Sequence, residues 1–104
     1  MKKILALLAL ASIANLALAA DGDPKAAEGK IAMCVGCHGI PGYKMAFPHV
    51  YHVPMIAGQN PKYIENALKA YQSGERKHPT MHSIAASLSD ADIAELASYY
   101  GGGK

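Results

Sequence analysis

Hydrophobic residues occur in two patterns along this chain: one unbroken run near the N-terminus and, further on, short stripes with helical spacing. Residues 4–18 are almost wholly apolar and follow the positively charged pair Lys2-Lys3. The run is shorter than the roughly 20 residues that span a bilayer, and it ends in the small-residue pattern Ala-Leu-Ala at 17–19. We therefore expect residues 1–19 to be a secretory signal peptide and residues 20–104 to form one domain. The alternative is an uncleaved membrane anchor.

Two later stretches have the spacing and the end signals of helices. The first begins at the capping pair Asp23-Pro24 and is expected to run to about Met33. Gly29 falls inside it, and close approach of another helix would explain a glycine there. The second begins at Asn60-Pro61 and ends at Gly74. Its apolar stripe has the spacing i, i+3, i+4, i+7 and consists of Ile64, Ala67, Leu68 and Tyr71.

A third helix is expected from Ser89, because Asp92 follows three residues later in a capping-box pattern. Between the helices, residues 36–58 are rich in glycine and proline and are predicted to form a long ordered loop. A second loop is predicted over residues 75–83, followed by a short helical turn at 84–88. No segment alternates like a β-strand. The fold class is therefore predicted to be all-α, with three main helices joined by long loops.

The composition limits both the core and the range of functions. Residues 20–104 contain no tryptophan, one phenylalanine and three leucines, so a domain of this size is marginal on its own core. A large flat cofactor would supply the missing apolar surface. Once Lys2 and Lys3 leave with the signal, eight basic residues balance eight carboxylates. This balance excludes the basic field that nucleic-acid binding needs.

The chemistry is concentrated in the pentapeptide Cys34-Val35-Gly36-Cys37-His38, whose spacing C-x-x-C-H is typical of c-type haem attachment. Two thiols three residues apart at the end of a helix reach the two vinyl groups at one porphyrin edge. The adjacent histidine then becomes an axial ligand of the iron. The predicted cofactor is one haem c with its iron, covalently bound through Cys34 and Cys37.

The cysteine pair has three other interpretations. A thioredoxin-like redox pair needs a βαβ setting, and the pattern shows no strands. A structural zinc site needs two more ligands with suitable spacing. A simple disulfide leaves His38 and the long loops unexplained. Haem attachment accounts for all of these features together.

Three segments carry a resemblance to a known family: Cys34–Gly39, Pro54–Gln59, and Met81 followed by residues 84–93. In these segments the chain resembles a class I cytochrome c, in particular the small bacterial monohaem cytochromes of the c4, c5 and c-553 type. The resemblance covers nearly all of residues 20–104. It implies the cytochrome c fold, in which three main helices and long loops wrap around one covalently bound haem.

The resemblance also implies the iron ligands and their surroundings. His38 is expected on one face of the iron and Met81 on the other. The carbonyl of Pro54 is expected to accept a hydrogen bond from the ring N–H of the axial histidine, which fixes the ring. Three further residues of that segment are expected near the haem: Ile56, which packs on its face, Gly58, which allows close backbone approach, and Gln59, a candidate partner of a propionate.

The sixth ligand has alternatives in the sequence. Met33 is expected to be a packing residue, Met45 has no counterpart in the family, and Met55 stands at a position that the family leaves variable. A histidine in place of Met81 would give a haem of lower reduction potential. The candidates for that role are His49, His52, His78 and His82.

The function implied by the resemblance is electron transfer by a periplasmic carrier that is not itself an enzyme. With both axial positions filled, iron has no site for a substrate. The expected partners are redox proteins, namely a donor dehydrogenase or cytochrome complex and an acceptor oxidase or reductase. No nucleic acid and no stable membrane insertion are expected after signal cleavage. The alternatives are a haem c subunit of a larger dehydrogenase or oxidase complex, and a ligand-binding or sensing cytochrome with an open sixth position.

Overall fold

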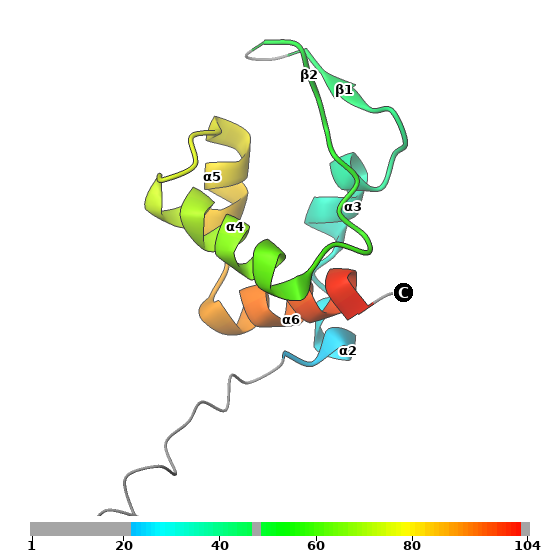
Figure 1. The fold of residues 1–104 in the computed structure, drawn as a ribbon, viewed down its shortest axis with the longest axis vertical. Helices are drawn as coiled ribbons and strands as arrows, with labels where there is room; N and C mark the ends of the chain where they lie inside the picture. The colour runs from blue at the N-terminus through cyan, green and yellow to red at the C-terminus, as the bar shows by residue number, and fades with distance from the viewer. Residues whose placement is uncertain (1–21, 47–48, 103–104) are drawn as a thin grey trace, which may run out of the picture.

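The computed structural model describes residues 22–46 and 49–102, and the expected signal peptide lies outside these residues. The described part is mainly helical, which confirms the all-α class (Figure 1). No helix within it is long and apolar enough to cross a membrane. Its helices and strands are α2 (Pro24–Ala27), α3 (Ala32–His38), β1 (Lys44–Met45), β2 (Tyr51–His52), α4 (Pro61–Ser73), α5 (Pro79–Ala86) and α6 (Asp90–Gly102).

Helix α4 forms where the sequence predicted it, with the expected signals at both ends. The Asn60 side chain accepts a hydrogen bond from the backbone N–H of Tyr63 at 3.1 Å, and Pro61 occupies the first turn. Gly74 ends the helix with a φ of 81°, a left-handed conformation that favours glycine. In Figure 1, α4 runs across the molecule with α5 above it and α6 below it, and it packs against both.

Helix α6 begins with the predicted capping box. Asp92 accepts a hydrogen bond from the backbone N–H of Ser89 at 2.8 Å, and the Ser89 hydroxyl accepts one from the N–H of Asp92 at 3.1 Å. The helix packs against both α2 and α4. The core at this end is small and consists of Ala27, Leu88, Ile93 and Leu96.

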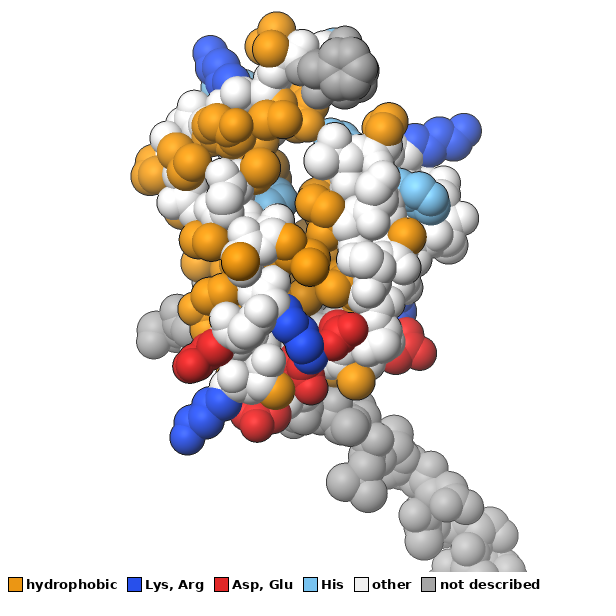
Figure 2. Space-filling view, turned by 180° about the vertical axis from the view of Figure 1, so that it is seen from behind, with side chains coloured by type: hydrophobic (Ala, Val, Ile, Leu, Met, Phe, Trp, Pro, Cys, Tyr) orange, Lys and Arg blue, Asp and Glu red, His pale blue; other side chains and the backbone are white. Residues whose placement is uncertain are grey.

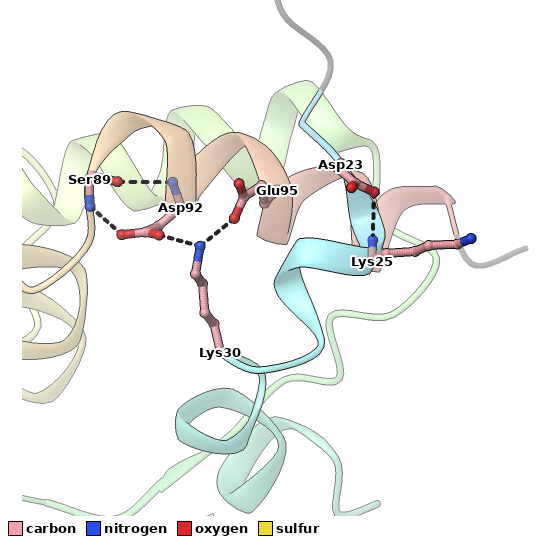
Figure 3. A network of polar contacts seen from close by, with 6 residues as sticks. All are labelled: Asp23, Lys25, Lys30, Ser89, Asp92 and Glu95. Carbon is pink, nitrogen blue, oxygen red and sulfur yellow. Dashed lines mark hydrogen bonds and ion pairs between the residues drawn. The ribbon is translucent and has the colours of Figure 1, made fainter.

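A group of charges covers the same end (Figure 3). Lys30 forms ion pairs with Asp92 and Glu95, so the segment after α2 is tied to the exposed side of α6. The Lys30 ammonium and the donors of Ser89 lower the pKa of Asp92 to about 2. This end of the molecule therefore combines a closed apolar core with a polar outer contact.

The prediction of one continuous helix at the start of the domain is wrong. The helix is broken into α2 and α3 by a turn over residues 28–31, and it extends to His38 rather than ending near Met33. Gly29 lies in this turn, and a Cβ placed there would meet nothing within 4 Å, so it is not a helix contact. The close approaches instead involve Gly22 against the backbone of Ala94 and Gly101 against the ring of Pro61.

The two predicted loops also contain regular structure. Strands β1 and β2 pair antiparallel in a small hairpin, in which Lys44 pairs with His52 and Met45 with Tyr51. The second predicted loop ends early, because α5 begins at Pro79 and reaches Ala86. Met81 therefore lies on a helix and not in a loop.

Candidate cofactor site

A cavity of about 410 Å³ lies between α3, the hairpin, α4 and α5, and its lining is mainly apolar. This volume is within the range of about 300–1,000 Å³ that is usual for cofactor sites. Figure 2 shows apolar side chains along a furrow in the middle of one face, with charged side chains gathered at the end of α2 and α6. The cavity brings together seven of the predicted site residues: Cys34, Cys37, His38, Pro54, Ile56, Gln59 and Met81.

Helix α3 supplies both cysteines and the histidine. Cys34 and Cys37 are three residues apart, so both lie on one side of the helix, and both are half-buried in the cavity wall. Burial raises the pKa of the Cys34 thiol, and the nearby Tyr100 hydroxyl opposes this shift in part. Redox-active Cys-x-x-Cys pairs have lowered thiol pKa values, so the direction of the shift does not favour a redox pair.

His38 is oriented by the segment that follows the hairpin. Its Nδ1 lies 2.6 Å from the carbonyl oxygen of Pro54, and a carbonyl only accepts, so Nδ1 donates. In the neutral ring this leaves the lone pair on Nε2, which is the arrangement found in metal-binding histidines. The structure thus places the Pro54 carbonyl in the position expected from the sequence.

All four methionines of the described residues line the cavity, so lining alone does not select a ligand. Their places in the fold do separate them. Met33 is on the same helix as His38, and Met55 directly follows Pro54, the residue that holds the His38 ring. Met81 comes from α5, which lies apart from α3 in Figure 1, and Met45 comes from β1. Met81 is therefore on an element other than the ones that hold His38.

The four alternative histidines differ in whether they line the cavity. His52 and His78 line the cavity, whereas His49 and His82 do not. The Nδ1 of His82 donates to the Tyr71 carbonyl at 2.7 Å. The Nδ1 of His78 accepts a hydrogen bond from the backbone N–H of Met81 at 3.3 Å.

Sequence reasoning did not place the apolar stripe of α4 in the site. The structure shows that this stripe forms a cavity wall, together with Ile84 and Leu88. The stripe itself was the available signal, since an apolar helix face must cover something.

Gly58, which was expected near the haem, does not line the cavity. Its φ is 83° and its N–H donates to the carbonyl of Tyr100 at 2.8 Å, so the structure uses it in a turn against α6.

The residues present fit a haem. Three large side chains that line the cavity are still about half exposed: Met33 at 44%, Met55 at 52% and Tyr63 at 53%. A flat apolar group in the cavity would cover such side chains. Two cysteines and an oriented histidine lie in the same wall, and such residues would be able to form the thioether bonds and the iron–nitrogen bond of a haem c.

Comparisons with known proteins agree with this geometry. Residues 26–100 match the family model described as cytochrome c. The chain is 44% identical over 82 residues to cytochrome c-554(548) of Halomonas halodenitrificans, covering 76% of this chain and 94% of that protein. It is 35% identical over 99 residues to cytochrome c-553 of Helicobacter pylori, covering 95% of each.

Two relatives are longer than this chain. The chain is 33% identical over 99 residues to cytochrome c4 of Pseudomonas aeruginosa, covering 95% of this chain but 47% of that protein. It is 34% identical over 93 residues to a thiosulfate dehydrogenase electron acceptor of Thiomonas intermedia, covering 89% of this chain and 42% of that protein. The chain thus spans about half of these relatives.

Proposed function

Because the chain belongs to the cytochrome c family, we propose that it is a periplasmic carrier of single electrons whose haem iron is held by His38 and Met81. The family membership confirms the resemblance seen in the sequence. It also shows that this is an electron-transfer protein with covalently bound haem c. The finer assignments, namely the axial ligands and the compartment, are the proposal.

One observation carries the proposal: the cavity has a fixed histidine on one element and a methionine on another. The Pro54 carbonyl holds the His38 ring with Nε2 free, and α5 brings Met81 to the same cavity. Cys34 and Cys37 are the residues that would form the two thioether bonds. Bound haem iron supplies one-electron chemistry by alternating between the ferrous and ferric states.

The chain's own residues do the remaining work. The apolar stripe of α4 and the side chains of α5 keep water away from the interior of the cavity. With haem bound, His38 and Met81 would hold the iron and leave no position open for a substrate, and ligation by the thioether would raise the reduction potential. These properties support a carrier and not an enzyme.

The proposed compartment and partners follow from the sequence. The expected signal peptide at residues 1–19 directs export, and covalent attachment prevents loss of haem in such a compartment. With a formal charge of zero after signal removal, steering toward a partner is weak and docking is brief. The partners are a donor dehydrogenase or cytochrome complex and an acceptor oxidase or reductase.

A second candidate is a haem c subunit of a larger complex. It is favoured by the similarity to the electron acceptor of thiosulfate dehydrogenase, of which this chain matches less than half. Purification from the native cell at near-physiological salt separates the two. A free carrier elutes at its own mass, whereas a subunit elutes with a dehydrogenase or oxidase.

The test of the ligand assignment uses the matured protein in both redox states. We expect a sulfur-to-iron charge-transfer band when it is oxidised and no rapid binding of carbon monoxide when it is reduced, because Met81 occupies the sixth position. Rapid and complete binding of carbon monoxide at neutral pH contradicts the carrier and supports a sensing cytochrome instead.

A further inference from the structure

Helix α5, which carries Met81, begins at an unusual cap. Helices usually begin at Ser, Thr, Asp or Asn, whose short side chains accept a hydrogen bond from the first turn. Here the N-cap is His78, with extended backbone angles of φ −153° and ψ 109°, followed by Pro79. Its ring nitrogen Nδ1 accepts from the backbone N–H of Met81 itself at 3.3 Å.

The His78 ring is also held by two other parts of the fold. It lies edge-on to Tyr51 of β2, with ring centres 4.8 Å apart and an angle of 85°. It lies edge-on to Tyr71 of α4, with ring centres 6.4 Å apart and an angle of 78°. Both geometries are favourable for aromatic pairs. The start of α5 is thereby joined to the hairpin and to α4 through one imidazole.

The two ends of α5 are fixed by different residues. At the C-terminal end, Nε2 of Gln72 donates to the carbonyls of Ala85 at 2.8 Å and Leu88 at 2.7 Å. At the N-terminal end, His78 supplies the side-chain cap, next to the turn that contains Met81. Removing the cap therefore loosens the start of α5, while the far end of the helix is still held by α4.

The hydrogen bond also decides which role His78 has. A backbone N–H only donates, so Nδ1 of His78 must accept, and the ring proton is then on Nε2. His38 has the opposite arrangement, because its Nδ1 donates to the Pro54 carbonyl. Binding of iron through Nε2 of His78 would require the proton to move to Nδ1, which would break the cap.

We propose that His78 is a positioning residue for the distal methionine: it caps the first turn of α5 through the Met81 N–H and so keeps the thioether at the iron. This inference rests on the proposed function, since it takes Met81 as the ligand. It assigns to one of the candidate histidines a role that excludes it from being the ligand.

The experiment is a titration of the oxidised holoprotein with imidazole, which takes the place of a dissociated methionine. The apparent affinity for imidazole rises in proportion to the fraction of protein in which methionine is off the iron. Loss of a side-chain cap lowers the equilibrium constant for forming the first turn of a helix by about fivefold. We expect His78→Ala to bind imidazole about fivefold more tightly than the wild type.

Three further variants separate the cap from other effects. His78→Asn keeps an acceptor at the cap and is expected to restore most of the wild-type affinity, whereas His78→Phe keeps only the ring and is not. His82→Ala removes an imidazole and its hydrogen bond to Tyr71 from the same helix, and we expect its affinity to stay within about twofold of the wild type. If Phe restores the affinity and Asn does not, packing holds the helix and the capping role is overturned.

A double-mutant cycle distinguishes this inference from the proposed function. In a Met81→Ala background, His78→Ala is expected to leave the imidazole affinity unchanged, because no methionine is left to position. An equal effect in both backgrounds overturns the positioning role while Met81 stays the ligand. If Met81→Ala itself neither tightens imidazole binding nor removes the charge-transfer band, the ligand assignment fails first.

Discussion

The two ends of this molecule are completed in different ways. Where α2 meets α6, a small buried core and the ion pairs of Lys30 close the contact with protein atoms alone. Where α3, the hairpin and α5 meet, a cavity of about 410 Å³ has apolar walls and half-exposed methionines. The comparison teaches that the chain supplies one half of its own interior and leaves the other half to the haem that its family carries.

The largest effect is expected from removing both attachment points. Cys34→Ala with Cys37→Ala should leave the exported chain without covalent haem, because neither thioether can form. Without a group in the cavity, the apolar walls lose their partner, and so hydrogen exchange should show protection lost first in α3 and α5.

The contact between α2 and α6 serves as the internal control of this hydrogen-exchange experiment. Protection in α6 where it packs on α2 should be lost last, since that contact needs no cofactor. A haem-free variant with fully protected α5 would show that the cavity end is as self-sufficient as the other.

The second largest effect is expected at the sixth ligand. Met81→Ala should abolish the sulfur-to-iron band of the oxidised protein and lower the reduction potential by on the order of a tenth of a volt or more, within the ~0.8 V range that axial ligands span. Met45→Ala and Met55→Ala are matched controls, because these methionines line the same cavity. Loss of the band in either control, with the Met81 variant unaffected, would transfer the ligand to that residue.

A third effect tests the end that the chain completes alone. Ile93 is fully buried and does not line the cavity, so Ile93→Ala should lower the free energy of unfolding by about 2–5 kcal/mol. The band should persist at low temperature, because His38 and Met81, the proposed ligands, are on other elements. Val50→Ala is a control at an exposed position of 72%, where a change within about 0.5 kcal/mol is expected in denaturant titrations.

The smallest effect concerns the charges outside that core. The folded pKa of Asp92 is about 2, against 3.8 ordinarily, so its contribution is complete above about pH 4 and is lost as the pH falls toward 2. Asp92→Asn keeps a capping side chain but removes the charge. Thermal unfolding of the variant should therefore depend less steeply on pH between 4 and 2. Identical pH profiles for the two proteins would show that the ion pair is without consequence.

How well each element of the fold was predicted from sequence depends on the local signals at its ends. Helices α4 and α6 were predicted with their caps, because Asn60-Pro61, Gly74 and the pair Ser89 and Asp92 are local signals that need no tertiary context. The break after α2 was missed. An alanine-rich stretch favours a helix, and the single Gly29 did not show that the chain would turn there.

Helix α5 and the hairpin were harder to predict for a physical reason. Helix α5 begins at a histidine cap, which is outside the usual set of capping residues. Its sequence does not divide clearly into one apolar and one polar helix face. The hairpin has two residues in each strand, too few for a period to appear. Both elements lack the usual end signals or a readable period, so their local sequence carries little of the information.

The residues that line the cavity were easier to name from the sequence than the elements that carry them. The motif at Cys34, Cys37 and His38 is a contiguous chemical signal, and the contact between His38 and Pro54 followed from the family resemblance. The apolar stripe of α4 was read from the sequence, but its target was not, since periodicity gives a face and not a partner. The capping role of His78 depends on one side-chain geometry that no sequence pattern encodes.

The central claim is that a covalently held haem completes the cavity end of this domain. The most direct measurement is the alkaline pyridine spectrum of the exported, matured protein after extraction with acidic acetone, which removes haem that is not covalently bound. The result expected is one haem per chain, retained after extraction, with the spectrum of a porphyrin that has lost both vinyl groups to sulfur. A colourless chain that is nevertheless compact, with α3 and α5 protected from hydrogen exchange, would contradict the claim.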